Sequence, residues 1–199
     1  MSDKKKWSSL DLAYIGMFIA LMAICSWINI PVAVPFTLQT FGVFAAVAML
    51  GVYRGTIAVV VYILLGTAGV PVFAGFTGGY GIVLGPTGGY IVGFVFMALI
   101  TGGILKAFGK KLPVMIAAML LGLAALYAFG TVWFIHVYGR ENGGISVMAA
   151  LSACVFPYIL PDCGKIALAI VMDRRLSGAV PEMGEGHMNS GGGKMMVGK

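Results

Sequence analysis

Long runs of apolar residues constrain this chain more than any other feature. Four of them stand out in the sequence, at 10–30, 91–105, 114–137 and 157–172. Their lengths approach or exceed the ~20 residues that a helix needs to cross a hydrocarbon core of about 30 Å. Hydrophobic residues make up 60% of the chain and charged residues only 10%, which is outside the range of a soluble globular domain. The sequence therefore predicts an integral membrane protein.

We expect these runs to be helices. In lipid, only helices and closed barrels satisfy every backbone polar group, and the runs lack the polar and apolar alternation of a barrel strand. The first run follows a basic head, as a signal peptide would, but it is longer than the about 7–15 residues of a signal core and no A-x-A-like site follows it. We therefore interpret 10–30 as a retained first helix.

The stretch 40–68 is interrupted by GVYRG at 51–55, and the positions of the basic residues favour two helices here over one. Lys and Arg in short loops stay on the cytoplasmic side of a membrane. With two helices the chain crosses six times and only Arg140 lies in an outer loop, whereas a single helix would leave Arg54 in mid-bilayer. The basic residues then placed inside are Lys4, Lys5, Lys6, Arg54, Lys106, Lys110, Lys111, Arg174 and Arg175. We predict an all-α bundle of six transmembrane helices with both termini in the cytoplasm.

This topology divides the chain into a cytoplasmic N-terminal segment at 1–9, a membrane domain at 10–175 and a Gly-rich tail at 176–199, which we expect to be disordered and cytoplasmic. The net charge of +6 then belongs to a cytoplasmic rim that faces anionic lipid. It does not indicate nucleic acid, because the basic residues are spread over loop ends. The three cysteines form no C-x-x-C pair, so we expect buried thiols rather than a metal site or disulfides.

Two uncharged segments are predicted to lie on the outer side, at 31–40 and 69–90. The helices between them have about 12–13 strongly apolar residues each, too few to span unaided at about 1.5 Å per residue. Non-helical chain must complete the depth, and it is tolerated there only if it is buried in protein or lines a cavity. The second segment interleaves glycines, at 75, 78, 79, 81, 85, 88 and 89, with aromatic residues, which suits either a tight fold over a ligand or a flexible connection. It contains no G-x-x-x-x-G-K-[ST] pattern, so any nucleotide is bound elsewhere.

Asp162 and Lys165 stand within the last apolar run, beside Pro157, Pro161 and Gly164. The prolines place the start of the last membrane helix near 157–161, after a short outer helix at about 146–155. Spaced i,i+3, the two charged residues share a helical face near the outer loops. Charges within a span are functional candidates by default, although a pair that only neutralises itself is the alternative. Together they suit a small molecule that bears both N–H and C=O groups.

Three separated motifs in this order make the chain resemble the BioY family, the biotin-specific substrate-binding S-components of energy-coupling-factor (ECF) transporters. The motifs are VPFTLQTF at 34–41, GVPVFAGFTGGYGIVLGPTGGYIVGF at 69–94 and FPYILPDCGKIALA at 156–169. The resemblance implies a six-helix bundle that holds biotin near the outer surface of a bacterial cell membrane. It also implies a transmembrane coupling protein and two cytoplasmic ATPase subunits as partners. ATP would be bound by those partners, and this chain would need no cofactor.

The resemblance also assigns roles to residues. Asp162 would accept the N–H groups of the biotin ureido ring and Lys165 would donate to its C=O, with Lys165 pairing the biotin carboxylate as the alternative. The other residues implied in the site are Thr37, Gln39, Phe73, Tyr80, Thr87 and Tyr90, for which packing or loop capping is the alternative. The family's A-x-x-x-A docking pattern on the first helix corresponds here to Gly16 and Ala20, where an internal packing seam is the alternative.

Two other classes of protein remain as rivals. An intramembrane enzyme would need a nucleophile with a base, but no G-x-S-x-G occurs, and His136 has no partner nearby in the sequence. An autonomous ion-coupled carrier would often contain internal repeats, and none is evident here. We therefore expect a binding subunit that is not an enzyme.

Overall fold

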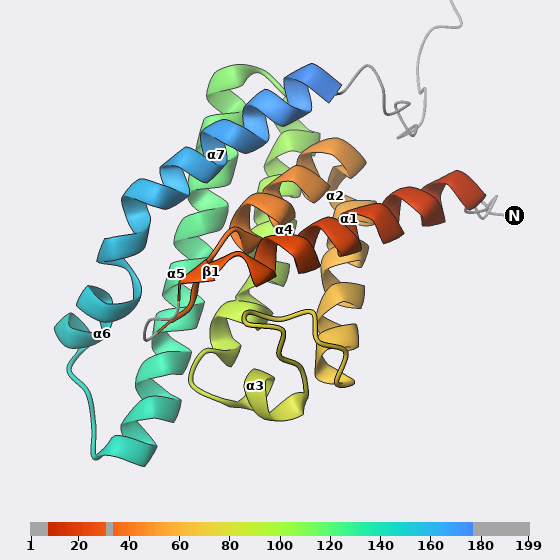
Figure 1. The fold of residues 1–199 in the computed structure, drawn as a ribbon. Coiled ribbons are helices and arrows are strands. Elements are labelled where there is room, and N and C mark those ends of the chain that lie inside the picture. Colours follow the sequence, from red (N-terminus) through yellow and green to blue (C-terminus); the bar gives the residue numbers. More distant parts are fainter. Residues whose placement is uncertain (1–7, 31–33, 177–199) are drawn as a thin grey trace, which may run out of the picture.

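The computed structural model describes residues 8–30 and 34–176, apart from the side chains of residues 141 and 142. Most of the described chain is helical (Figure 1). The helices are α1 (Ser9–Trp27), α2 (Gln39–Thr67), α3 (Tyr80–Leu84), α4 (Gly88–Phe108), α5 (Leu112–Asn142), α6 (Val147–Cys154) and α7 (Phe156–Leu176). Two short strands, β1 (Asn29–Ile30) and β2 (Phe36–Thr37), form an antiparallel pair. Most of the predicted N-terminal segment 1–9 and of the tail 176–199 lies outside the described residues.

Five helical segments within the described residues are long and apolar enough to cross a membrane. They are α1, α2, α4, most of α5, and α6 taken together with α7. The prediction of a helical, multi-pass membrane protein is therefore confirmed in this form. The short outer helix expected before the last span is present as α6, and Pro157 occupies the first turn of α7, where its missing N–H is harmless.

The long helix α2 reverses direction at Gly51. The backbone of Gly51 has φ 78° and ψ 174°, which is not helical and is essentially restricted to glycine. A Cβ atom added at Gly55 would lie 2.7 Å from the Cα of Val47. Residues eight apart in a straight helix are separated by about 12 Å, so the two halves of α2 fold back against each other. The interruption predicted at 51–55 is therefore present, and the orange ribbon of α2 turns sharply in Figure 1.

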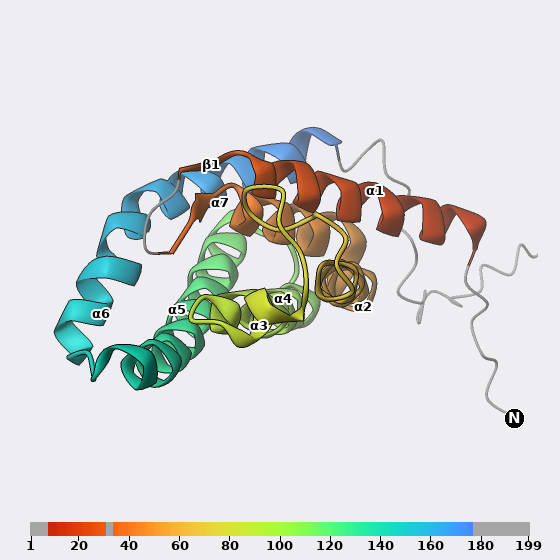
Figure 2. The same ribbon diagram turned by 60° about the horizontal axis from the view of Figure 1, so that its bottom comes forward.

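The first half of α2 lies at the centre of the molecule. All of its residues from Gln39 to Ala48 are buried, and α2 packs against α1, α4 and α7. Figure 2 shows α1 and α7 crossing one side of the molecule, with α4 and α5 on the other. Met22 of α1 approaches Gly42 so closely that an added Cβ would lie 3.0 Å from its side chain. Close approach matters because packing, rather than removal of apolar surface from water, drives helix association in lipid.

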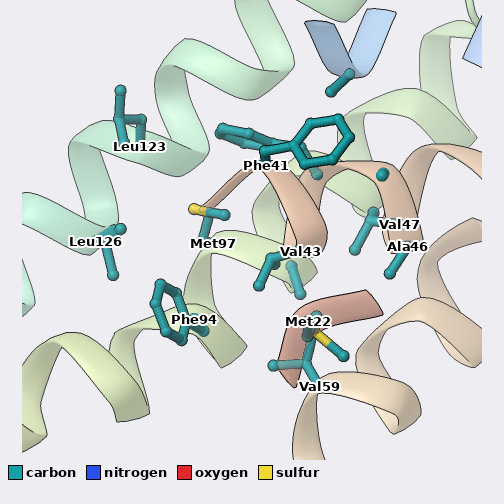
Figure 3. Close-up of a cluster of buried hydrophobic side chains, with 14 of the residues drawn as sticks. Met22, Phe41, Val43, Ala46, Val47, Val59, Phe94, Met97, Leu123 and Leu126 are labelled. Atoms are coloured by element: carbon teal, nitrogen blue, oxygen red, sulfur yellow. The ribbon is translucent and has the colours of Figure 1, made fainter. Parts of the chain in front are cut away.

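The core between these helices is made of aliphatic, methionine and phenylalanine side chains (Figure 3). Val43 and Val47 of α2 and Phe94 and Met97 of α4 belong to this cluster, and all four are at most 4% exposed. The packing fixes the relative positions of α2, α4 and α7. These helices carry most of the polar side chains described next.

Two ion pairs tie helix ends to neighbouring turns. Asp11 near the start of α1 lies 3.1 Å from Arg54, just after the reversal in α2. Asp173 near the end of α7 lies 3.1 Å from Lys110, in the connection between α4 and α5. Both carboxylates are buried. The basic partners, Arg54 and Lys110, are among the residues that the sequence analysis predicted on the cytoplasmic side.

Candidate ligand-binding site

A cavity of about 340 Å³ opens between the helices and the two uncharged segments. This volume lies within the range of small-molecule sites. Its wall is mostly apolar, with a few polar groups that converge from different elements. The lining residues are Val34, Pro35, Thr37, Gln39, Thr40, Phe73, Ala74, Thr77, Ile82, Thr87, Tyr90, Ile91, Phe94, Leu126, Tyr127, Cys154, Tyr158, Asp162 and Lys165.

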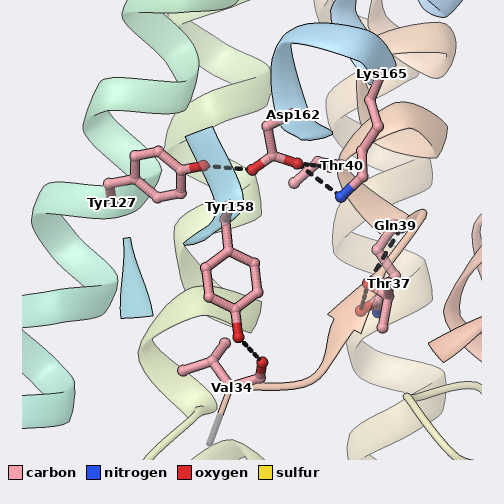
Figure 4. Close-up of polar contacts among 8 residues, drawn as sticks. All are labelled: Val34, Thr37, Gln39, Thr40, Tyr127, Tyr158, Asp162 and Lys165. Atoms are coloured by element: carbon pink, nitrogen blue, oxygen red, sulfur yellow. Dashed lines mark hydrogen bonds and ion pairs between the residues drawn. The ribbon is translucent and has the colours of Figure 1, made fainter. Parts of the chain in front are cut away.

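Asp162 is the best-connected polar group of this wall (Figure 4). Its Oδ1 accepts hydrogen bonds from Thr40 Oγ1 at 3.1 Å and from Lys165 Nζ at 2.6 Å. Its Oδ2 accepts one from the hydroxyl of Tyr127 at 2.5 Å. Since a carboxylate has about four acceptor positions, room remains for a ligand N–H. The side chain is only 2% exposed, so these donors replace the water that it has lost.

Lys165 is 5% exposed and lies one helical turn from Asp162. Its ammonium also stands over the ring of Phe36, 4.4 Å from the ring centroid. The Asp162 ion pair and this cation–π contact together offset the cost of burying the charge. An ammonium has three donors, and within the described chain Lys165 uses one of them for Asp162. It therefore retains capacity to donate to a carbonyl in the cavity.

A chain of hydrogen bonds joins the two uncharged segments beneath the cavity. Thr37 Oγ1 donates to Gln39 Oε1 at 2.9 Å, and Gln39 Nε2 donates to the hydroxyl of Tyr62 at 2.5 Å. Tyr62 in turn donates to the Val72 carbonyl at 2.7 Å, which also accepts from Ser26 Oγ at 2.6 Å. Gln39 thus supports the loop as well as lining the cavity.

The loop at 69–79 is fixed to the end of α1 by aromatic side chains. Trp27 Nε1 donates to the Pro71 carbonyl at 2.9 Å, and the Phe76 ring stacks on Trp27 with centroids 4.7 Å apart. Phe76 adopts φ 59°, a left-handed conformation that is rare outside glycine. Phe73 is buried and packs edge-on against Tyr62. The loop therefore forms one wall of the cavity rather than a flexible connection.

Most of the residues expected in the site from the sequence meet at this cavity. Those that line it are Thr37, Gln39, Phe73, Thr87, Tyr90, Asp162 and Lys165. Tyr80 is not among the lining residues: it begins the short helix α3, which buries none of its residues, and its side chain is 72% exposed. The Tyr90 hydroxyl is 3.0 Å from Thr131 Oγ1 of α5, so this residue also joins two helices.

Sequence reasoning missed several polar residues of the wall, notably Thr40, Tyr127 and Tyr158. Tyr127 lies within the apolar run of α5, outside the three motifs. Tyr158 donates to the backbone carbonyl of Val34 and so holds the first uncharged segment. The only signal in the sequence was the rarity of hydrogen-bonding side chains within a span, and this does not say which group they contact.

Gly16 and Ala20 are not among the residues that line this cavity, and both are exposed on α1. A side chain added at Gly16 would meet no atom within 4 Å. An internal packing seam would bring another helix against them, so that alternative is wrong for the described chain. The two small residues form part of an outer face of α1.

The polar and aromatic groups of this wall are suited to binding a ligand. A buried carboxylate and ammonium present an acceptor and a donor side by side, and aromatic rings flank the space in front of them. Such a site can hold a neutral polar group that has N–H and C=O on adjacent atoms. No group of three or more His, Cys, Asp or Glu side chains suited to a metal ion occurs in the described part of the chain.

Comparison with known proteins gives consistent results. The sequence profile of the BioY family matches residues 1–182. The chain is 38% identical over 162 residues to "Biotin transporter BioY" of Thermotoga maritima, covering 81% of this chain and 92% of that protein. It is 41% identical over 177 residues to "Probable biotin transporter BioY" of Lysinibacillus sphaericus, covering 85% and 88%.

A solved structure also resembles the fold. The crystal structure of "the S-component for biotin from an ECF-type ABC transporter" superimposes with a TM-score of 0.74 at 30% identity. The match covers 89% of this chain and 95% of that one. The predicted resemblance is therefore confirmed: the chain belongs to the BioY family.

Proposed function

We propose that this protein is the biotin-binding S-component of an ECF transporter, which captures biotin outside the cell and delivers it with separate coupling and ATPase subunits. The observation that carries the proposal is the buried pair of Asp162 and Lys165 in the wall of a cavity of about 340 Å³. The names of its relatives, biotin transporters and a biotin S-component, support the same ligand.

The chemistry of biotin suits this wall. Its ureido ring carries two N–H groups and one C=O, so Asp162 is assigned to the N–H side and Lys165 to the C=O side. Phe73 and Tyr90 would flank the fused rings. Thr37, Gln39 and Thr87 would contribute further polar contacts from the outer segments. Biotin would enter between groups that are already hydrogen-bonded, so little side-chain ordering would accompany binding.

We propose six membrane crossings, with both termini cytoplasmic and the cavity near the outer face of a bacterial cell membrane. The membrane domain is assigned to residues 10–175 and the tail to 176–199. Reversal at Gly51 supports the count, because it divides α2 into 12 residues before and 16 after it. These halves are about 18 and 24 Å long at about 1.5 Å per residue, so the segments that line the cavity complete the depth.

We further propose that the coupling protein docks on α1 at Gly16 and Ala20. Both residues are exposed, and small residues let a second helix approach closely. Their exposed neighbour Met17 adds a flexible apolar contact on the same helix. The lipid bilayer would cover the remaining exposed apolar surface of the helices.

Binding, rather than catalysis or autonomous transport, is the role we assign to this chain. An ion-coupled carrier is the principal alternative, and uptake of labelled biotin separates the two. Cells that express this chain alone should take up far less biotin than cells that also express the coupling protein and ATPases. Equal uptake in both would favour the carrier.

Calorimetry on the purified chain tests the site. We expect tight binding of biotin and a loss of about 2–5 kcal/mol in Asp162→Asn, because truncating one partner of a buried charged hydrogen bond leaves the other unpaired. Lys165→Ala should have a similar effect. Asp173→Asn is the control, since it also neutralises a buried carboxylate that forms an ion pair, with Lys110, but lies outside the cavity. Unchanged affinity in both site variants would contradict the assignment.

A further inference from the structure

We infer that the site recognises the ring system of biotin and leaves its carboxylate outside, so that uncharged amides and esters of biotin are also ligands. This inference rests on the proposed function and specifies the class of molecule that the same cavity accepts. It follows from where charge is present along the cavity wall and from which part of the wall is exposed.

The charged groups of the wall are already matched. Of the described residues that line the cavity, only Asp162 and Lys165 carry charge, and they lie 2.6 Å apart. Their sum is zero. A ligand carboxylate buried beside them would add a negative charge without a cation to balance it. In a medium of low dielectric constant such a charge is costly, so a carboxylate is disfavoured inside the cavity.

Lys165 is a poor candidate to balance a ligand carboxylate. To do so it would have to share or give up its contact with Asp162, which is 2% exposed. Thr40 and Tyr127 would then be the remaining donors to the buried Asp162 carboxylate. Two neutral hydroxyl donors replace an ammonium incompletely. The energetic cost favours an intact ion pair that binds a neutral group, and the ureido ring is such a group.

Exposure of the lining residues indicates the direction of the ligand. Asp162 and Lys165 are buried, and Pro35 and Tyr127 are partly exposed. Thr77 is the one exposed residue among the described lining residues, and Ala74, Ile82 and Thr87, which lie near it in the sequence, are partly exposed. These four belong to one stretch, from the 69–79 loop to the start of α4. With its ring at the ion pair, biotin would extend its chain towards this stretch. The four residues define the mouth of the cavity, and none of them is charged.

An exposed carboxylate at this mouth contributes little to affinity. Water and salt screen it, and interactions of exposed charges alter affinity by less than about tenfold. The hydroxyls of Thr77 and Thr87 can donate either to a carboxylate or to an amide carbonyl. Replacing the carboxylate by an amide therefore removes a charge that the site does not use.

The experiment compares biotin with biotinamide, its neutral isostere, by calorimetry on the purified full-length chain. We expect the two dissociation constants to agree within about tenfold. If biotinamide bound about 100-fold or more weakly than biotin, the inference would be overturned, because a loss of affinity of that size is typical of removing a partner from a buried charge pair. If biotin itself fails to bind, the proposed function fails. If biotin binds and the amide does not, only this inference fails.

A second comparison uses variants. If Lys165 paired the carboxylate, Lys165→Met would weaken the binding of biotin but leave the binding of biotinamide unchanged. That result would contradict the inference. With the carboxylate outside, the variant should weaken both ligands by the same factor. Ala74→Trp places a large side chain at the mouth. It should lower the affinity for a long amide of biotin, in which a lysine extends the chain, more than the affinity for biotinamide. Equal effects on the short and the long amide would show that the chain does not leave through this mouth.

Discussion

At the scale of single residues, the site depends on how completely Asp162 is satisfied before any ligand arrives. Three donors from three helices reach it: Thr40 from α2, Tyr127 from α5 and Lys165 from α7. The carboxylate is therefore held in one orientation, and its remaining acceptor positions are directed by those contacts. A self-satisfied ion pair and a binding site are not exclusive alternatives here, because the pair is formed and also lines the cavity.

Tyr127→Phe tests this orientation. The variant keeps the ring and removes the hydroxyl that donates to Asp162 Oδ2, so we expect biotin affinity to fall by about 1.5–3 kcal/mol, the usual value for a hydrogen bond to a charged group. Calorimetry measures the change. Tyr53→Phe removes the same hydroxyl from an exposed residue outside the cavity and should leave affinity unaltered. Equal affinities of Tyr127→Phe and the wild type would show that the hydroxyl does not position Asp162.

At the scale of elements, the reversal of α2 decides where the site is. The first half of α2 lies between α1, α4 and α7, and it brings Gln39 and Thr40 to the cavity. The second half carries the chain into the 69–79 loop, which contributes Phe73 and Thr77. Without the turn at Gly51, a single helix would place its two ends far apart, and they could not line one cavity.

We expect Gly51→Ala to destabilise the protein by about 1–3 kcal/mol, since its backbone conformation is one that a Cβ disfavours strongly. Thermal denaturation of the purified protein in detergent would measure the loss. Gly103→Ala is the control, because Gly103 lies within α4 and a Cβ there would meet no atom within 4 Å. If the denaturation temperature of Gly51→Ala were as high as that of Gly103→Ala, the backbone at residue 51 would not require glycine.

The outer face of α1 gives a second test at this scale. Gly16→Leu should abolish most biotin uptake in cells with the complete transporter, because a large side chain would keep the coupling protein from approaching the helix. Biotin binding by the purified chain should not change, since Gly16 does not line the cavity. Gly103→Leu, another exposed glycine without neighbours, should leave uptake intact. Reduced uptake in both variants would indicate a general effect of bulk on lipid-facing helices.

At the scale of the whole molecule, the cavity and the ion pairs at the helix ends lie in different regions. The described ion pairs outside the cavity, Asp11 with Arg54 and Lys110 with Asp173, join helix ends to turns. The cavity instead lies beneath segments without a charged side chain. This separation matches a membrane protein whose basic loops stay inside and whose ligand enters from the outside.

Labelling of intact cells with a membrane-impermeant maleimide tests the orientation. In a variant whose three native cysteines are replaced by alanine, Thr77→Cys should react from outside, because Thr77 is exposed at the cavity mouth. Lys111→Cys, in the connection between α4 and α5, should react only after the cells are opened. Labelling of both residues, or of Lys111→Cys alone, in intact cells would reverse or refute the proposed topology.

Much of this architecture could be predicted from the sequence. The apolar runs and the positions of Lys and Arg are local properties, so they indicated the helices and the break near Gly51 correctly. The i,i+3 spacing likewise placed Asp162 and Lys165 on one face of one helix. Tyr80 shows the limit of such reasoning, since its place in a motif did not indicate whether its side chain points to the cavity or away from it.

The sequence by itself determined that this chain is a helical membrane protein with a charged pair in its last apolar run and two uncharged segments, at 31–40 and 69–90. Only the tertiary structure decided that Tyr127 and Thr40 contact Asp162, at separations of 35 and 122 residues along the chain. The physical reason is that hydrophobicity, charge and periodicity act over a few turns. Contacts between distant helices depend instead on how whole helices pack against one another, which no local pattern specifies.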